Sequence, residues 1–74
     1  MPTTTRTRIL FGKRVRELRL KRKWSQEKLA EESGLHTTYI SGIERGRRNV
    51  GMENVVKLAR ALKVDVGQLF KGVH

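Results

Sequence analysis

The sequence predicts an all-α fold, a compact five-helix domain, from three observations. Apolar residues recur at intervals of three and four, which is the period of amphipathic helices. Glycines and helix-capping residues separate these segments. No repeat, low-complexity tract, β-hairpin signal or glycine-rich phosphate loop interrupts them. Because the chain has only 74 residues, we expect a single domain with a modest core.

Residues 1–7 are expected to form a flexible, extended basic arm, and residues 8–74 the domain itself. The first helix is expected from Arg8 to Arg22, with an apolar stripe formed by Phe11, Val15 and Leu18. Trp24 follows this helix. Because it is the only tryptophan and offers no series of stacking aromatics, we interpret it as a lid on the core.

The next segment, Gln26 to Arg45, predicts two short helices joined by a hinge at residues 33–35. Ser25 is a good N-cap for the first helix, and Gly34 stands where a chain leaving a helix needs a positive φ. Ala30 would let the two helices approach closely. An ordinary helical hairpin remains the alternative to a DNA-reading pair, because this geometry alone is common.

The second helix of the pair would begin at a cap formed by His36 or Thr37, and Ile40 and Ile43 would anchor it to the first helix. Its outward face would then carry small polar side chains: Thr37, Thr38 and Ser41. Gly46 would end it.

Two further helices complete the fold. The fourth is expected at Met52 to Leu62, with a buried face formed by Met52, Val55, Ala59 and Leu62. Asp65 and Gln68 form a capping box for a short fifth helix that carries Val66, Leu69 and Phe70. The last four residues are expected to fray.

The charge distribution points to a polyanionic partner. The chain has 17 Lys and Arg against 7 Asp and Glu, a formal charge of +10. Residues 25–44 carry a net charge of −3, between strongly basic flanks that can contact phosphates. Crowded arginines after the third helix favour an anion nearby, whereas Lys57, Arg60 and Lys63 are interpreted as a solvated helix face.

Other classes of function find little support in the residues. The chain contains no cysteine, and no apolar run approaches the ~20 residues that span a bilayer, so we expect a cytoplasmic, nucleoid-associated protein without a membrane partner. His36 and His74 are the only histidines and have no acid pair or metal-ligand spacing beside them. We therefore expect no enzyme, metal or cofactor.

At this point the sequence resembles the lambda-repressor-like, or XRE-type, helix-turn-helix regulators. The resemblance rests on FGKRVRELRLKRKWSQEKLAEESGLHTTYISGIERGRRN, on VVKLARALKV and on DVGQLF. Within this family, TYISGIERGRRN is most similar to the controller proteins of restriction-modification systems. The resemblance implies a sequence-specific regulator of transcription that binds double-stranded DNA, with the helix-turn-helix at the second and third helices.

The resemblance also implies roles for particular residues. Base contacts would come from His36, Thr37, Thr38 and Ser41. Phosphate contacts would come from Gln26, Arg45, Arg47, Arg48 and Asn49. An ion pair would join Arg19 to Glu44. For Tyr39, a purely packed ring and a hydroxyl that contacts a phosphate are both open.

Two positions depart from the expected pattern. Gly42 stands where many relatives carry a long polar side chain, and we hypothesise that it lets the helix lie closer to DNA. Lys28 stands where a capping box would have Glu or Gln. Because threonine and serine lack the bidentate contact of arginine with guanine, DNA shape should contribute, with Arg6 and Arg8 in the arm as minor-groove probes.

Regulators of this kind bind as twofold dimers, so a homodimer is expected. Its interface would use the fifth helix, through Val66, Leu69, Phe70 and Val73, although Leu69 and Phe70 can equally fill the domain's own core. RNA polymerase is a further candidate partner. The alternatives are an antitoxin-type or phage-type repressor of the same fold, or a nucleic-acid-binding protein without sequence specificity.

Overall fold

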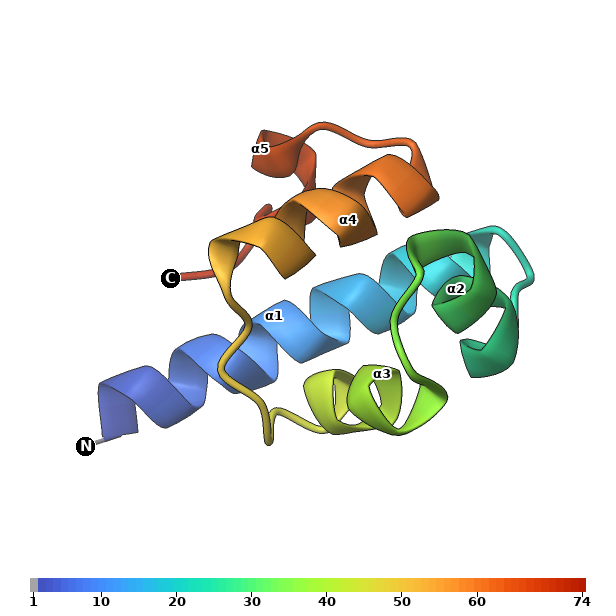
Figure 1. Cartoon of the computed structure of the whole chain (residues 1–74). Coiled ribbons are helices and arrows are strands. Elements are labelled where there is room, and N and C mark those ends of the chain that lie inside the picture. The colour runs from blue at the N-terminus through green and yellow to red at the C-terminus, as the bar shows by residue number, and fades with distance from the viewer. Residues whose placement is uncertain (1) are drawn as a thin grey trace.

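The computed structural model describes residues 2–74, with side chains described from residue 5 onward. Five helices follow one another and no strand occurs in this range: α1 (Pro2–Lys21), α2 (Gln26–Ser33), α3 (Thr37–Glu44), α4 (Met52–Leu62) and α5 (Val66–Leu69) (Figure 1). The expected all-α, five-helix fold is confirmed. None of these helices is both long and apolar enough to cross a membrane.

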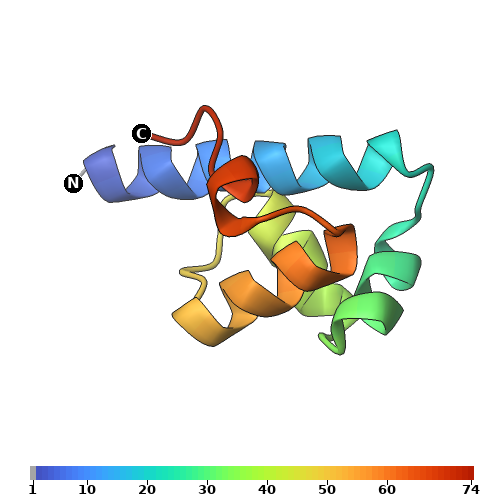
Figure 2. The same cartoon turned by 90° about the horizontal axis from the view of Figure 1, so that it is seen from above.

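The long helix α1 is the element around which the others are arranged. In Figure 1, α3 lies below α1, whereas α4 and α5 lie above it. Seen from above, α2, α3 and α4 lie on one side of α1, and α1 forms the back of the domain (Figure 2). Helix α1 contacts α3, α4 and α5, and α2 contacts α3 and α4, so every helix contributes to one core.

The core contains nearly all the apolar residues that the periodicity predicts. Val15, Leu29, Ile40, Ile43, Leu62 and Leu69 are almost completely buried, together with Leu58. Trp24 is half-buried against this core, as expected. Met52 is a correction, because 83% of it is exposed. It is the first residue of α4, before the buried face begins at Val55, and the preceding Val50 packs against the core instead.

The N-terminal arm is a second correction. Residues 2–7 continue α1 rather than forming an extended segment, while Met1 of that arm lies outside the described residues. Proline is well tolerated in the first turn of a helix, and no helix breaker separates Pro2 from the apolar stripe. The first turns of α1 extend beyond the other helices (Figure 2). Further along α1, Ile9 lies against Gly46, so α1 contacts the chain just after α3.

The caps of α2 form as predicted, whereas those of α3 form only in part, because its C-cap residue is Arg45 and not Gly46. Ser25 Oγ accepts a hydrogen bond from the Lys28 backbone N–H at 3.0 Å, which caps α2. Gly34 has φ +76° and ends α2, and Gly46 has φ +74° just after α3. His36 occupies the N-cap position of α3, although its side chain makes no capping hydrogen bond.

The capping box at α5 is also present. Asp65 Oδ1 accepts from the Gln68 N–H at 2.7 Å, and Gln68 Oε1 accepts from the Asp65 N–H at 3.3 Å. These two bonds fix the start of a helix of only four residues.

Helices α1 and α3 approach each other closely at Gly12, a residue for which the sequence carries no such signal. A Cβ atom at this position would overlap the carbonyl oxygen of Ile43 and would lie 2.9 Å from that of Glu44. The backbone of α1 therefore lies directly on the end of α3. Glycine at position 12 thus sets how deeply α3 sits against α1.

Candidate nucleic-acid interface

The outer face of α3 presents the polar residues that the sequence predicts. Thr37 and Thr38 are exposed, Ser41 is half-exposed one turn later, and His36 is exposed at the N-cap. On the opposite face of the helix, Ile40 and Ile43 are at most 1% exposed. Helix α3 therefore divides into a buried apolar face and an outer face of small hydrogen-bonding side chains.

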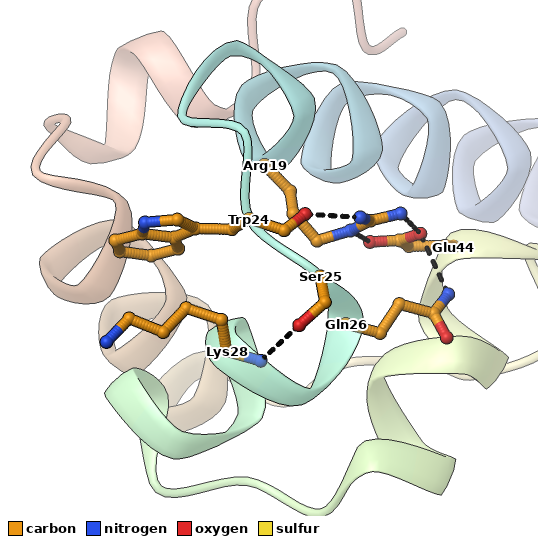
Figure 3. A network of polar contacts seen from close by, with 6 residues as sticks. All are labelled: Arg19, Trp24, Ser25, Gln26, Lys28 and Glu44. Carbon is orange, nitrogen blue, oxygen red and sulfur yellow. Dashed lines mark hydrogen bonds and ion pairs between the residues drawn. The ribbon is translucent and has the colours of Figure 1, made fainter.

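A buried ion pair fixes the end of α3 to α1 (Figure 3). Arg19 Nε donates to Glu44 Oε2 at 2.7 Å, and Arg19 Nη2 donates to Glu44 Oε1 at 2.9 Å. The third group, Nη1, donates to the backbone oxygen of Trp24 at 2.8 Å. The hydrogen bond to Glu44 raises the pKa of Arg19, which stabilises its charged form. The ion pair expected between Arg19 and Glu44 is therefore present.

Gln26, for which a phosphate contact is expected, belongs to the same network. Its Nε2 donates to Glu44 Oε1 at 3.1 Å, as Figure 3 shows. An amide carries two N–H groups and one acceptor oxygen, so the half-buried Gln26 retains a further donor. A single side chain at the start of α2 is thus oriented by the end of α3.

The loop after α3 gathers three exposed arginines, Arg45, Arg47 and Arg48, and the exposed Asn49. Within residues 2–74, no carboxylate lies within ion-pair distance of these arginines. Among the other cations, Arg14 bonds Glu17, which lowers the pKa of that carboxyl, and Lys28 is paired with Glu31 and Glu32. The loop next to the outer face of α3 therefore carries uncompensated positive charge.

Tyr39 packs against the core and makes two further contacts, while the phosphate contact of its hydroxyl stays a prediction. Its ring is half-buried against the core, and its hydroxyl accepts a hydrogen bond from Asn54 Nδ2 at 3.1 Å. The guanidinium of Arg48 lies 5.6 Å from the ring centroid. Asn54 was not predicted, because a polar residue in the first turn of α4 carries no signal of a partner on α3.

Gly42 has a different neighbour from the one hypothesised. It is buried, and its free space is filled by the side chain of Arg48, whose Cγ would lie 2.9 Å from an added Cβ. Gly42 therefore packs against the protein's own loop.

The two residues expected to probe the minor groove, Arg6 and Arg8, lie on a helix and not on an extended arm. Arg6 is exposed on α1. Arg8 is half-buried and lines a cavity of about 80 Å³ together with Phe11, Arg48 and Val50. Its Nε is buried and has no hydrogen-bond partner among the described residues. The structure thus removes the extended geometry on which the minor-groove prediction depended.

The expected dimer residues divide into two groups. Leu69 is 0% exposed, so its inclusion in an interface is wrong, since α5 must bury this side chain to dock on the domain. Phe70 contacts Phe11, with ring centroids 5.0 Å apart, yet remains 37% exposed. Val66 is 43% exposed and Val73 is half-buried. An apolar surface therefore remains at Val66 and Phe70.

The residues described contain no group of three His, Cys, Asp or Glu side chains that could hold a metal ion.

Comparison with known proteins identifies the family. The sequence profile of the helix-turn-helix family matches residues 15–69. The control protein C.BamHI from Bacillus amyloliquefaciens is 56% identical over 63 residues, which cover 84% of this chain and 78% of that protein.

Solved structures agree. The restriction-modification controller protein C.AhdI from Aeromonas hydrophila superimposes with a TM-score of 0.83 at 49% identity, covering 85% of this chain and 96% of that one. The controller protein C.Esp1396I, solved as a tetramer in complex with its natural 35 base-pair operator, gives a TM-score of 0.82 at 31% identity, covering 90% and 88%. The present chain belongs to the helix-turn-helix family and is most similar to the restriction-modification controller proteins within it.

Proposed function

We propose that this protein is a sequence-specific regulator of transcription that binds double-stranded DNA as a homodimer, and that it controls a restriction-modification system. The observation that carries the proposal is the outer face of α3, where exposed Thr37 and Thr38 lie beside a loop of unpaired arginines. Small polar side chains on a protruding helix match base edges in a major groove, and the arginines match phosphates on either side.

The proposed contacts follow the order of the chain. His36, Thr37, Thr38 and Ser41 would read base edges, because all four lie at the start or on the outer face of α3. The remaining donor of Gln26 and the exposed loop residues would bind phosphates: Arg45, Arg47, Arg48 and Asn49. Threonine methyl groups can also contact the methyl group of thymine.

Two further features support a dimer on DNA. The exposed apolar side chains of Val66 and Phe70 offer a surface for a second copy. The similar controller C.Esp1396I is a tetramer on its operator, so multimeric binding occurs among the relatives. Two copies related by a twofold axis would place their α3 helices about 34 Å apart, one turn of DNA. RNA polymerase stays a candidate partner.

Selection of bound sequences from a random pool of duplex DNA tests this function directly. We expect a twofold motif with half-sites separated by about one helical turn. A double variant of the outer face, Thr37→Ala with Thr38→Ala, should retain the fold and lose the preference, since neither side chain is buried. Absence of enrichment by the parent protein at physiological salt would contradict sequence-specific binding and leave charge alone as the source of affinity.

A further inference from the structure

The side chain of Arg48, which comes from the loop after α3, lies against one flank of α3 at Gly42. Gly42 is buried, and an added Cβ would lie 2.9 Å from Arg48 Cγ, 3.0 Å from its Nε and 3.5 Å from its Cδ. These three atoms belong to one side chain, so the aliphatic stem of Arg48 lies flat across Gly42. Any other residue at position 42 would occupy the place of this stem.

From Gly42 the side chain of Arg48 extends along α3 toward the N-terminal end of that helix. Tyr39 precedes Gly42 by three residues, so the two positions are neighbours on one flank of the helix. The Arg48 guanidinium lies 5.6 Å from the centroid of the Tyr39 ring. The stem therefore rests on Gly42, and the charged end lies over Tyr39, next to the outer face of α3.

Neighbouring groups hold this arrangement from both sides. Asn54 Nδ2 donates to the Tyr39 hydroxyl at 3.1 Å, which fixes the ring that supports the guanidinium. The Arg47 N–H donates to the Gly42 carbonyl oxygen at 2.9 Å, which ties the loop to the end of α3. The charge itself has no carboxylate partner among the described residues.

An arginine already restrained near its binding position loses less conformational entropy when it meets an anion than a freely moving one. Arg48 is restrained in this way. For Arg47, which is also exposed, the described residues provide neither a stacking ring nor an ion pair. The two arginines should therefore contribute differently to binding, although their charges are equal.

We propose that Gly42 is a positioning residue for DNA binding. By leaving room for the stem of Arg48, it keeps the guanidinium on Tyr39, where it contacts a phosphate at the edge of the groove that α3 enters. This inference rests on the proposed function and adds to it a specific reason for glycine at position 42. It replaces direct approach of the DNA to Gly42, because the Arg48 side chain occupies that space.

A double-mutant cycle of Gly42→Ala and Arg48→Ala tests the proposal on the DNA site recovered by selection. Alanine at 42 should weaken binding by about three- to tenfold in the parent and have little effect in the Arg48→Ala background, because contacting residues are coupled. The thermal midpoint should not fall, since alanine favours a helix over glycine and a flexible side chain can move aside. Gly51→Ala is the matched control, because its Cβ would meet nothing within 4 Å.

A nuclear magnetic resonance measurement reports the position of Arg48 without DNA. The Nε–H resonance of Arg48 should be displaced by the ring current of Tyr39 in the parent and should move toward that of Arg47 in Gly42→Ala. A parent-like resonance or parent-like affinity in Gly42→Ala would overturn the proposal. So would an equal loss of affinity with and without Arg48.

The proposed function and the positioning role of Gly42 are contradicted by different results. If the parent protein selects no DNA sequence, the proposed function is wrong, and so is the role of Gly42 at a specific site. If the parent selects a site and the cycle shows no coupling between positions 42 and 48, only the positioning role is wrong.

Discussion

Glu44 accepts hydrogen bonds from Arg19 and Gln26, so a single carboxylate at the end of α3 joins three helices. The side chains of the ion pair are 9% and 2% exposed, for Arg19 and Glu44 respectively. In such surroundings a charge without its partner is strongly unfavourable, although the intact pair adds little net stability. The role of this pair is to orient α3.

Replacement of Arg19 by methionine should therefore destabilise the protein by about 3–5 kcal/mol, because Glu44 would remain buried with only the Gln26 amide as a partner. Urea denaturation measures this change. The double variant Arg19→Met with Glu44→Met is the control and should recover much of the loss, since no charge is then left unpaired. A single-variant loss below about 1 kcal/mol would show that solvent reaches Glu44.

Of the contacts that Glu44 makes, the sequence predicted one and missed the other. The Arg19–Glu44 pair was expected only through family resemblance, and its geometry agrees with that expectation. The link from Gln26 to Glu44 was not expected, because a polar residue at a helix start is equally suited to solvent, phosphate or protein. The position of Arg48 over Gly42 depends on how the loop folds back, which no helical period encodes.

At the scale of helices, the periodic pattern predicted each element, and the errors occur at ends and contacts. Met52 continues the apolar period of α4, yet the helix projects past the core at that residue. Residues 2–7 carry no apolar stripe, but they extend an existing helix, which requires no new nucleation. Gly12 gave no signal because its importance depends on where the backbone of α3 lies, and that position is a property of the tertiary structure.

The contact between α1 and α3 gives a prediction for Gly12. Alanine there would overlap the Ile43 carbonyl oxygen, so the helices must separate, and we expect a loss of stability of about 1–3 kcal/mol despite the better helix propensity of alanine. Chemical denaturation of Gly12→Ala and of the parent measures it. Unchanged stability would mean that α3 can move from α1 without penalty.

Across the whole molecule, positive charge is distributed unevenly around the helix pair α2 and α3. The segment that contains α2 and α3 is the least basic part of the chain, and strongly cationic segments precede and follow it. Helix α3 lies against α1 with its outer face exposed. Because the arginine loop directly follows α3, its positive charges lie next to the polar residues of that face. In the proposed function, affinity for phosphates and discrimination among bases come from adjacent but different side chains.

This arrangement predicts a steep dependence of DNA affinity on salt. In a plot of log affinity against log salt concentration, Arg47→Ala should reduce the slope by about one, because one phosphate contact is lost. Lys57→Ala is the control, since this exposed lysine lies on α4, and its slope should match the parent's. An unchanged slope in Arg47→Ala would remove that arginine from the phosphate contacts.

The division of α3 into two faces has an evolutionary consequence. Ile40, Ile43 and Glu44 hold the helix in place, whereas Thr37 and Thr38 make no contribution to the core. Mutations at the outer positions can therefore accumulate without a loss of folding stability to oppose them. Under the proposed function, a lineage that carries this domain can acquire a new operator through a few codon changes while its scaffold is inherited intact.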